Sequence, residues 1–379
     1  MTKKRAQIGD KAILTVNVGG AFTRLSWHAP DGRQHGRAQK LASDLSPPEI
    51  LARLAAMRDH SGVGQPAVIG HRMVHAGPAL AGSVFIDTES EAAIRQYAAM
   101  APLHAPLALN WVQACRECFG ADVPQTASFD SALYAELPAV AAHYAIPKSL
   151  GLRRLGFHGL AHGWMLRHGE RHQPAGFGQR KIISLQLGSG ASITASIGGK
   201  PVDTSMGMTP LEGLVMNSRC GDLDPGIILY LQTQKGMSPQ DIEALLSRRS
   251  GLLGLSGTSG DISVLLASNE PAAALAVDIF CYRIRKYIGA YVAVLGGLDQ
   301  VLIGGGIGEH LPAIRSRVLT PLQFLGIQLN HDENQRMTAR EGTISCKDSR
   351  VKVDIIQIQE NRLIAEDAAQ LLKERSIYR

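Results

Sequence analysis

The sequence predicts an α/β protein made of two similar domains with a cleft between them. Each half opens with paired strands joined through glycine turns, at residues 12–18 with 23–27 and at 182–187 with 191–197. Each half then closes with strands that run into helices. The length of 379 residues exceeds what one hydrophobic core usually spans, so we expect two domains.

Composition favours a folded protein and excludes two classes of function. Hydrophobic residues make up 45% and charged residues 19% of the chain, as in globular proteins. The net charge of +6 is spread over short basic clusters without interleaved aromatic residues. We therefore expect anionic small ligands and no nucleic acid.

No apolar run approaches the ~20 residues of a membrane span, and we expect neither a secretion signal nor a membrane partner. An odd number of cysteines, five, indicates a reducing compartment, so we expect a cytoplasmic protein.

The elements of the first half follow turn and capping signals. The strand at 12–18 turns at residues 17–20, and residues 23–27 return beside it. Residues 47–57 predict a helix with Ser46 as its N-cap and Pro47 at its first position. A short core strand at 67–69, a helix at 107–119 and a strand at 126–129 follow. Asp130 ends the last of these, where α/β folds place metal or substrate ligands, and a helix is expected after it.

The second half repeats this plan. After a helix that contains His162 come the hairpin at 182–197 and a loop that contains Arg219. We expect a glycine-rich linker at 251–257, a long amphipathic helix at 271–295 and a buried strand at 301–303. A last strand at 351–358, Glu360 just beyond it and a closing helix at 364–372 complete the chain.

Four glycine-rich segments carry the candidate chemistry. The turn at 188–190 is either an ordinary hairpin tip or a cradle for phosphate, because glycine lets backbone N–H groups approach an anion. Residues 70–77 (GHRMVHAG) form either a solvated basic loop or an anion site. Residues 153–159 (RRLGFHG) are hard to explain by packing alone. Residues 304–309 (GGGIGE) follow a strand and resemble a nucleotide cradle, although their spacing matches neither a Walker loop nor a Rossmann fingerprint.

Together these segments resemble the acetate kinase family, in its acetate and propionate kinase branch. The shared motifs stand in family order: GHRMVH at 70–75, APLH at 101–104, FD at 129–130, RLGFHG at 154–159, VDTSMG at 202–207, TPLEG at 209–213, GDLDPG at 221–226 and GGIGE at 305–309. The resemblance implies the duplicated fold shared by actin and hexokinase, with an interdomain cleft. It implies a first domain at 1–148, completed by a helix at 365–379, a nucleotide-binding domain at 149–364, and a homodimer formed through the second domain.

The resemblance also implies a reaction. The γ-phosphoryl group of ATP passes directly and in line to acetate or propionate, giving an acyl phosphate and ADP. Such a catalyst must gather anions and stabilise charge on the transferring group. Arg72 and Arg219 match the family arginines that do this, His158 matches a histidine bonded to that group, and His104 matches a less critical one. Asp130 either helps to organise the metal or orients the carboxylate.

The remaining implied positions bind the substrates and the metal. Val74, Leu103, Phe157 and Pro210 match a small acyl pocket, and the retained Val74 favours a two- or three-carbon acid. Asn17 and Glu360 match positions that organise Mg²⁺, with Mn²⁺ as its substitute. The matching nucleotide-binding positions are Gln186, Gly188, Ser189, Gly190, Asp261, Ile262, Ser263, Gly305, Gly306, Ile307, Gly308 and His310.

The chain departs from the family pattern on the phosphoryl-donor side. Hydroxyl groups are missing after Asn17, and Arg24 replaces a lysine. Gln186 stands in place of a histidine, the Asp-Phe-Arg motif becomes residues 261–263, and His310 replaces an asparagine. Three hypotheses stay open: a carboxylate kinase that uses ATP, the same enzyme with another phosphoryl donor, and a non-catalytic nucleotide-binding or regulatory descendant.

Overall fold

The computed structural model describes residues 12–19, 22–75, 77, 80, 82–97 and 105–377. Contacts divide the chain into two compact units, Met1–Ala135 with Gln359–Arg379 and Glu136–Ile358. Residues 136–148 therefore group with the second unit and residues 359–364 with the first. The expected domains, with boundaries after residues 148 and 364, are parts that would fold independently. These boundaries stay a prediction.

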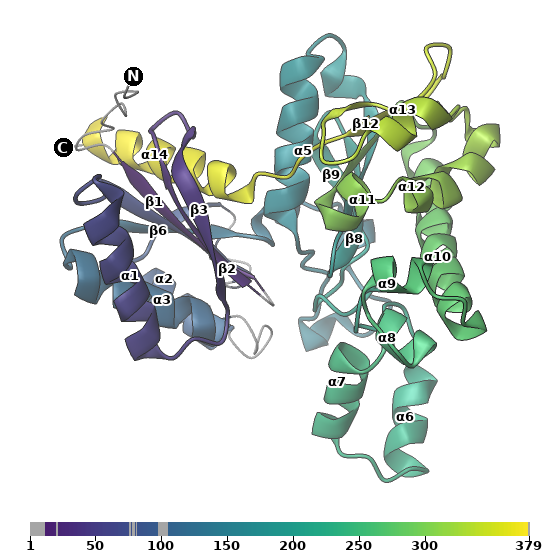
Figure 1. Cartoon of the computed structure of the whole chain (residues 1–379). Helices are drawn as coiled ribbons and strands as arrows, with labels where there is room; N and C mark the ends of the chain where they lie inside the picture. The colour runs from purple at the N-terminus through teal and green to yellow at the C-terminus, as the bar shows by residue number, and fades with distance from the viewer. Residues whose placement is uncertain are drawn as a thin grey trace. The chain divides into compact units, whose positions relative to one another are not determined.

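The first unit is a mixed sheet with helices on both faces (Figure 1). Its strand order is β3-β2-β1-β4-β6-β5, with β1 (Ile13–Val18), β2 (Phe22–His28), β3 (Gln34–Ala42), β4 (Val68–Met73), β5 (Val84–Phe85) and β6 (Gln125–Phe129). The helices are α1 (Pro47–Ser61), α2 (Thr88–Gln96), α3 (Ala105–Phe119) and α14 (Glu360–Ile377), and a 3-10 turn covers Ala132–Tyr134. Leu14 and Val16 of β1 pack in a core with α1 and α3, whereas Ile13 packs with Ala365 and Ala368 of α14. Both faces of β1 are covered, which explains why the apolar residues Ile13 and Leu14 stand next to each other in it.

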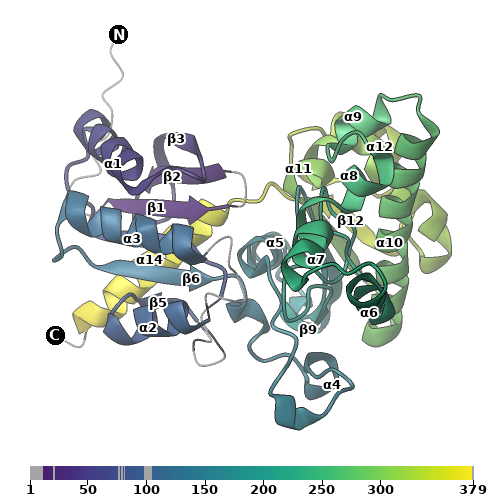
Figure 2. The same ribbon diagram turned by 90° about the horizontal axis from the view of Figure 1, so that it is seen from below.

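The second unit is also a six-stranded sheet, in the order β11-β12-β10-β7-β8-β9. Its strands are β7 (Lys181–Leu187), β8 (Ala191–Ile197), β9 (Lys200–Thr204), β10 (Gln300–Gly304), β11 (Gly342–Thr343) and β12 (Lys352–Ile355). Helix α5 (Gly159–His172) packs against β7 and β10, and α10 (Pro271–Leu295) packs against β7 and β8. Figure 2 shows this unit from below.

Shorter helices surround the second sheet. They are α4 (Ala139–Ala142), α6 (Pro225–Thr233), α7 (Pro239–Arg248), α8 (Gly251–Ser256), α9 (Ile262–Leu266), α11 (Gly305–His310), α12 (Pro312–Leu319) and α13 (His331–Arg336), with 3-10 turns at Lys148–Leu150, Phe177–Gln179 and Thr320–Leu325. Across the described residues, no helix is both long and apolar enough to cross a lipid bilayer.

The two sheets have the same topology. In each, three consecutive antiparallel strands are followed by two parallel ones, β3-β2-β1-β4-β6 and β9-β8-β7-β10-β12. A short antiparallel strand, β5 or β11, completes each edge. This confirms the predicted duplicated α/β architecture. It also places the carboxyl ends of β1, β4 and β6, and those of β7, β10 and β12, at corresponding edges.

The structure corrects four local predictions. Residues 251–256, expected in a linker, form α8, because N–H groups of residues 252 and 253 donate to the carbonyls of Met216 and Asn217 and Leu252 is buried. The expected loop from residue 70 is strand β4 as far as Met73, and Gly70 serves close packing: a Cβ there would lie 2.6 Å from Ile364 Cγ2. The last strand ends at residue 355 rather than 358, and a single 3-10 turn follows Asp130 where a helix was expected.

Candidate active site

The first group of predicted residues lies at the carboxyl ends of β4 and β6. Arg72 belongs to β4, Asp130 follows β6, and the parallel register that pairs Met73 with Phe129 brings the two side chains together. Arg72 Nη2 and Nε donate to Asp130 Oδ2 at 2.6 and 3.1 Å, and Nη1 donates to Val18 O at 2.8 Å. The Arg72 side chain is 11% exposed and that of Asp130 is 1% exposed. This ion pair is therefore nearly removed from water.

Electrostatics keep Arg72 charged in this setting. Burial alone would lower the pKa of its guanidinium, but the carboxylates of Asp130 and Glu360 outweigh burial and the pKa is raised. A planar, permanently charged guanidinium is suited to carboxylate and phosphoryl oxygens. The pairing fixes its orientation before any substrate arrives.

Asn17 and Glu360, the predicted metal positions, are bonded to each other. Asn17 Nδ2 donates to Glu360 Oε2 at 2.8 Å and to Asn361 Oδ1 at 3.0 Å. In the part of the chain that the structure describes, no three His, Cys, Asp or Glu side chains are placed to hold a metal together. Mg²⁺ in kinases is held by one or two carboxylates, waters and substrate phosphates. A carboxylate beside an amide, both hard oxygen donors, fits that mode of binding.

A buried histidine, His75, supports this edge of the first sheet. His75 Nε2 accepts from Gly77 N at 3.1 Å, so its proton is on Nδ1, which donates to Ser131 Oγ at 2.8 Å. Burial lowers the pKa of His75 to about 4, so the ring is neutral at physiological pH. Ser131 is next to Asp130, and Val74 beside His75 is buried. Leu103 and His104, the other two predicted residues of this region, lie outside the described residues.

The second group is built around the N-terminus of α5. His158 is the N-cap of that helix, with φ of 58°, and it is one of two non-glycine residues in the described chain with positive φ. A left-handed conformation costs an L-residue about 1 to 2 kcal/mol and is found most often at functional positions. His158 Nδ1 lies 2.9 Å from Ser192 Oγ on β8.

Arg219 and His158 converge on the glycine turn between β7 and β8. A Cβ built on Gly190 would lie 2.9 Å from Arg219 Nη2 and 3.1 Å from His158 Nε2. Arg219 Nη1 also donates to the carbonyl of Pro210 at 2.7 Å. Phe157, 1% exposed, is buried beside His158. The guanidinium of Arg219 and the ring nitrogen of His158 thus both lie next to the backbone of Gly190, which has no side chain.

Two glycine segments lie side by side at the ends of β7 and β10. The parallel register pairs Gln186 with Gly304, and a Cβ on Gly188 would lie 3.9 Å from Gly306 N. Glu309 holds the second segment, because its Oε1 accepts from Gly305 N at 2.9 Å and from Ile358 N at 3.2 Å. Such paired backbone turns can receive phosphate oxygens.

Gln186, where the family resemblance implies a histidine, is incompletely bonded. Its Oε1 is buried and finds no hydrogen-bond donor among the described residues. A Cβ on Gly305, which has φ of +81°, would lie only 2.3 Å from that oxygen. The amide therefore occupies the floor between the two glycine segments.

The predicted adenosine-side residues are dispersed over two helix ends. Asp261 caps α9 and accepts from Ser263 N at 2.8 Å, and both residues are exposed. Ile262 is 2% exposed, so its side chain belongs to the core. Ser189 and His310 are exposed, whereas Ile307 and Gly308 are buried in α11.

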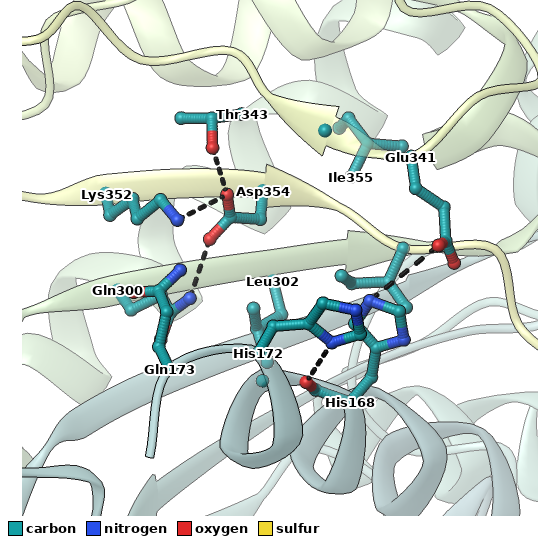
Figure 3. Close-up of a pocket in the computed structure, with 13 residues that line it drawn as sticks. His168, His172, Gln173, Gln300, Leu302, Glu341, Thr343, Lys352, Asp354 and Ile355 are labelled. Atoms are coloured by element: carbon teal, nitrogen blue, oxygen red, sulfur yellow. Dashed lines mark hydrogen bonds and ion pairs between the residues drawn. The ribbon is translucent and has the colours of Figure 1, made fainter. Parts of the chain in front are cut away.

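A separate pocket lies at the other end of α5 and holds none of the predicted residues. It has a volume of about 290 Å³ and lies between that helix and strands β10, β11 and β12 (Figure 3). The carboxylate of Asp354, which lines the pocket, is bonded to Gln300 Nε2 (2.6 Å), Thr343 Oγ1 (2.6 Å) and Lys352 Nζ (3.2 Å). The carboxylate of Asp354 thus finds its partners among side chains that line the same pocket.

Sequence reasoning assigned no role to the residues that support the site. Arg154 Nη2 and Tyr144 Oη both donate to Glu212, at 2.6 and 2.5 Å, which ties the loop after β9 to the segment before α5. Ser192 and His162 lie behind His158. Arg154 and Glu212 stand in motifs, but no local pattern shows which residues bond to each other, because the partners are 30 or more residues apart in the chain.

Comparison with known proteins places this geometry in a family. The model of the acetokinase family matches residues 38–366. Acetate kinase from Solibacter usitatus is 39% identical over 97% of this chain and 89% of its own length. The crystal structure of Porphyromonas gingivalis acetate kinase is 31% identical, with a TM-score of 0.86 over 96% of this chain and 100% of that chain. A propionate kinase from Francisella tularensis is also 31% identical, with a TM-score of 0.85 over 95% and 100%.

The duplicated α/β fold and the cationic groups at its strand ends define a phosphotransferase of the actin/hexokinase-like class. Its acceptor is a carboxyl group and its donor is a nucleotide, ATP, used with Mg²⁺. The chain belongs to the acetokinase family.

Proposed function

We propose that this chain transfers the γ-phosphoryl group of ATP to acetate, with propionate as a second acceptor. The observation that carries the proposal is the convergence of Arg219 and His158 on Gly190. A cation and a hydrogen-bond donor at a side-chain-free turn are what a transferring phosphoryl group requires.

The reaction needs positioning more than proton transfer. A carboxylate oxygen of the acceptor attacks the γ-phosphorus, and the bond to the oxygen that bridges the β- and γ-phosphates breaks, leaving ADP. The acceptor is already ionised at neutral pH, so no general base is required. We therefore assign Asp130 to orienting Arg72, with which it pairs at 2.6 Å, and Arg72 to holding the acceptor or the phosphoryl oxygens.

Asn17 and Glu360 would hold the Mg²⁺ ion, which when bound neutralises charge on the nucleotide phosphates. Their mutual hydrogen bond of 2.8 Å keeps both side chains at the end of β1 and the start of α14. Mn²⁺, another cation suited to carboxylate and carbonyl oxygens, is expected to substitute.

We assign Val74, Leu103, Phe157 and Pro210 to the acyl group of the acceptor, as the family resemblance implies. A difference of one methylene changes binding by only about 1 to 3 kcal/mol. We therefore expect acetate to be preferred over propionate without strict exclusion.

A changed phosphoryl donor is the second candidate, and Gln186 favours it. A neutral amide replaces a histidine that could carry positive charge, and its buried Oε1 has no donor among the described residues. Gln186→His should raise the rate with ATP if weakened phosphate contact limits it.

The assembly and location are inferred from further observations. Helix α6 has no buried residue, yet it exposes Ile227, Ile228, Leu229 and Tyr230 at 36 to 61%. Apolar side chains gathered in this way indicate a protein interface, and we propose a homodimer formed through the second unit.

Five free cysteines support a cytoplasmic location.

One assay tests the function. Acyl phosphate is trapped as the hydroxamate with acetate or propionate as acceptor and with ATP, other nucleoside triphosphates or pyrophosphate as donor. Arg219→Ala should lower kcat at least about 100-fold with little change in nucleotide affinity, since its role is in the transition state. Arg248→Ala, an exposed arginine at the end of α7, is the control. Folded protein that forms no hydroxamate with any donor would contradict the proposal.

A further inference from the structure

A continuous hydrogen-bonded chain leads from the interior of the second unit to His158. Ser184 Oγ lies 2.7 Å from His162 Nδ1, His162 Nε2 lies 2.8 Å from Ser192 Oγ, and Ser192 Oγ lies 2.9 Å from His158 Nδ1. Ser184, His162 and Ser192 are each 0% exposed. The chain therefore has one buried end, at Ser184 on β7, and one end at the site.

The buried end sets the direction of the hydrogen bonds. Among the described residues, Ser184 Oγ is hydrogen-bonded to one side-chain atom, His162 Nδ1. A buried hydroxyl must donate its proton somewhere, so Ser184 donates to His162 Nδ1. A neutral imidazole that accepts at Nδ1 carries its proton on Nε2. His162 Nε2 then donates to Ser192.

The neutrality of His162 is supported by its surroundings. It is completely buried, and burial lowers its pKa to about 3. A neutral ring has one donor and one acceptor, so the two serines cannot both receive protons from it. Since Ser192 Oγ accepts from His162, its own single proton is available for His158 Nδ1.

We propose that Ser184, His162 and Ser192 are positioning residues that hold His158 with its proton on Nε2, aimed at the transferring phosphoryl group. The proposal rests on the proposed function for the role of His158. Nε2 faces the site, because it would lie 3.1 Å from a Cβ on Gly190, next to Arg219 Nη2. With the opposite tautomer, a ring lone pair would face phosphate oxygens and no hydrogen bond would form there.

The position of His158 agrees with this role. Its φ of 58° at the N-cap of α5 turns the ring toward Ser192 on β8, and the hydrogen bond to Ser192 holds it there. The ring acts as a hydrogen-bond donor to developing charge, and no proton leaves it during the reaction. In other enzymes the loss of one such donor lowers kcat by about 100- to 1,000-fold.

The tautomer can be measured without activity. We would record ¹⁵N NMR spectra of the full-length protein with labelled histidine and identify the His158 signals by their loss in His158→Asn, a residue that tolerates left-handed φ. The expected result is a protonated Nε2 and an unprotonated Nδ1. Ser192→Ala should give a mixture of both tautomers. A wild-type His158 protonated on Nδ1 alone would overturn the proposed direction.

Kinetics test the consequence for catalysis. Ser192→Ala should lower kcat about 10- to 100-fold and leave the KM values for ATP and acetate within about threefold. Ser196→Ala is the matched control, since Ser196 is a buried serine of the same strand that bonds to Ile182 O instead. His162→Gln, which retains an N–H donor toward Ser192, should keep most of the activity, whereas His162→Leu should not.

The outcomes separate the two proposals. Wild-type kcat in Ser192→Ala, with the tautomer changed, would overturn the role of the chain in catalysis. Full activity in His158→Asn would instead contradict the proposed function of His158, and the NMR result would still decide the tautomer. If His162→Leu does not fold, Ser192→Ala and the spectra alone decide.

Discussion

At the scale of single residues, Gly190 gives the sharpest test of the site. We expect Gly190→Ala to lower kcat about tenfold, because its Cβ would displace Arg219 Nη2 and the His158 ring, at 2.9 and 3.1 Å, and small misplacements of catalytic groups are costly. The melting temperature should change little, since the nearest atoms that must shift belong to two side chains, Arg219 and His158, and none to the backbone. Gly289→Ala in α10, where a Cβ meets nothing within 4 Å, is the control. Unchanged activity in Gly190→Ala would contradict the convergence of the two side chains.

Glu360 tests the proposed metal position. Removing Mg²⁺ with a chelator should abolish activity, and either Mg²⁺ or Mn²⁺ should restore it. In Glu360→Gln the bond from Asn17 Nδ2, 2.8 Å in the wild type, can persist through the amide oxygen, but the negative charge is lost. We expect at least about a tenfold higher Mg²⁺ concentration for half-maximal rate. Glu366→Gln on the same helix should leave the Mg²⁺ requirement unchanged; equal requirements in all three proteins would remove Glu360 from the metal site.

Sequence reasoning found single residues that stand in a motif and missed those that act through space. Arg72, Asp130 and His158 stand in recognisable motifs and Arg219 matches a family position, and the structure brings them together in pairs, Arg72 with Asp130 and His158 with Arg219. Ser184 is a core position of a strand when taken from the sequence. Only the antiparallel pairing of β7 with β8 and the packing of α5 bring it close to His162.

At the scale of elements, α6 tests the assembly. We expect Leu229→Glu to shift the protein from dimer to monomer in sedimentation velocity, because Leu229 is 61% exposed on a helix with no buried residue and a buried charge opposes association. Phe324→Glu, at a position 77% exposed outside α6, should leave the dimer intact. A Leu229→Glu protein that remains dimeric would place the interface elsewhere.

Elements were predictable where the local pattern decides. Helix α10 covers residues 271–295 as predicted, because a proline at its start and a glycine at its C-cap delimit a long amphipathic run. Helix α1 has the predicted Ser46 cap. The edge strands β3 and β9 carry weak apolar patterns and depend on their neighbours for pairing. Helix α8 has two glycines in a short sequence, so propensity disfavours it, and contacts with residues 216–217 override that preference.

At the scale of the whole molecule, buried histidines set the acid stability. Burial lowers the pKa of His71 and His75 to about 4 and that of His162 to about 3, whereas an unfolded chain keeps values near 6.5. Below that pH the unfolded chain binds more protons than the folded chain. The contribution of these buried, neutral histidines to the free energy of unfolding is therefore fully present above about pH 6.5. It falls as the pH drops toward 4, by about 1.4 kcal/mol per pH unit for each histidine.

Urea unfolding at about pH 7.5, 6.5 and 5 measures this dependence. His71 Nε2 lies 2.6 Å from Gln125 Oε1, and His71→Gln retains an N–H donor toward that oxygen. This variant should reduce the slope of the unfolding free energy against pH by the equivalent of about one proton. A free energy of unfolding that does not change between these pH values would show that the histidines are protonated in the folded protein.

Taken alone, the sequence determined the duplicated α/β plan, the family and the residue types of the site. These follow from apolar periodicity, glycine turns and motifs, all of which are local along the chain. Tertiary structure decided which groups meet. The register of β4 with β6 pairs Arg72 with Asp130, and the packing of α5 on β7, together with the pairing of β7 with β8, connects His158 to a buried serine. Hydrogen bonds and ion pairs depend on distance in space, which sequence separation does not record.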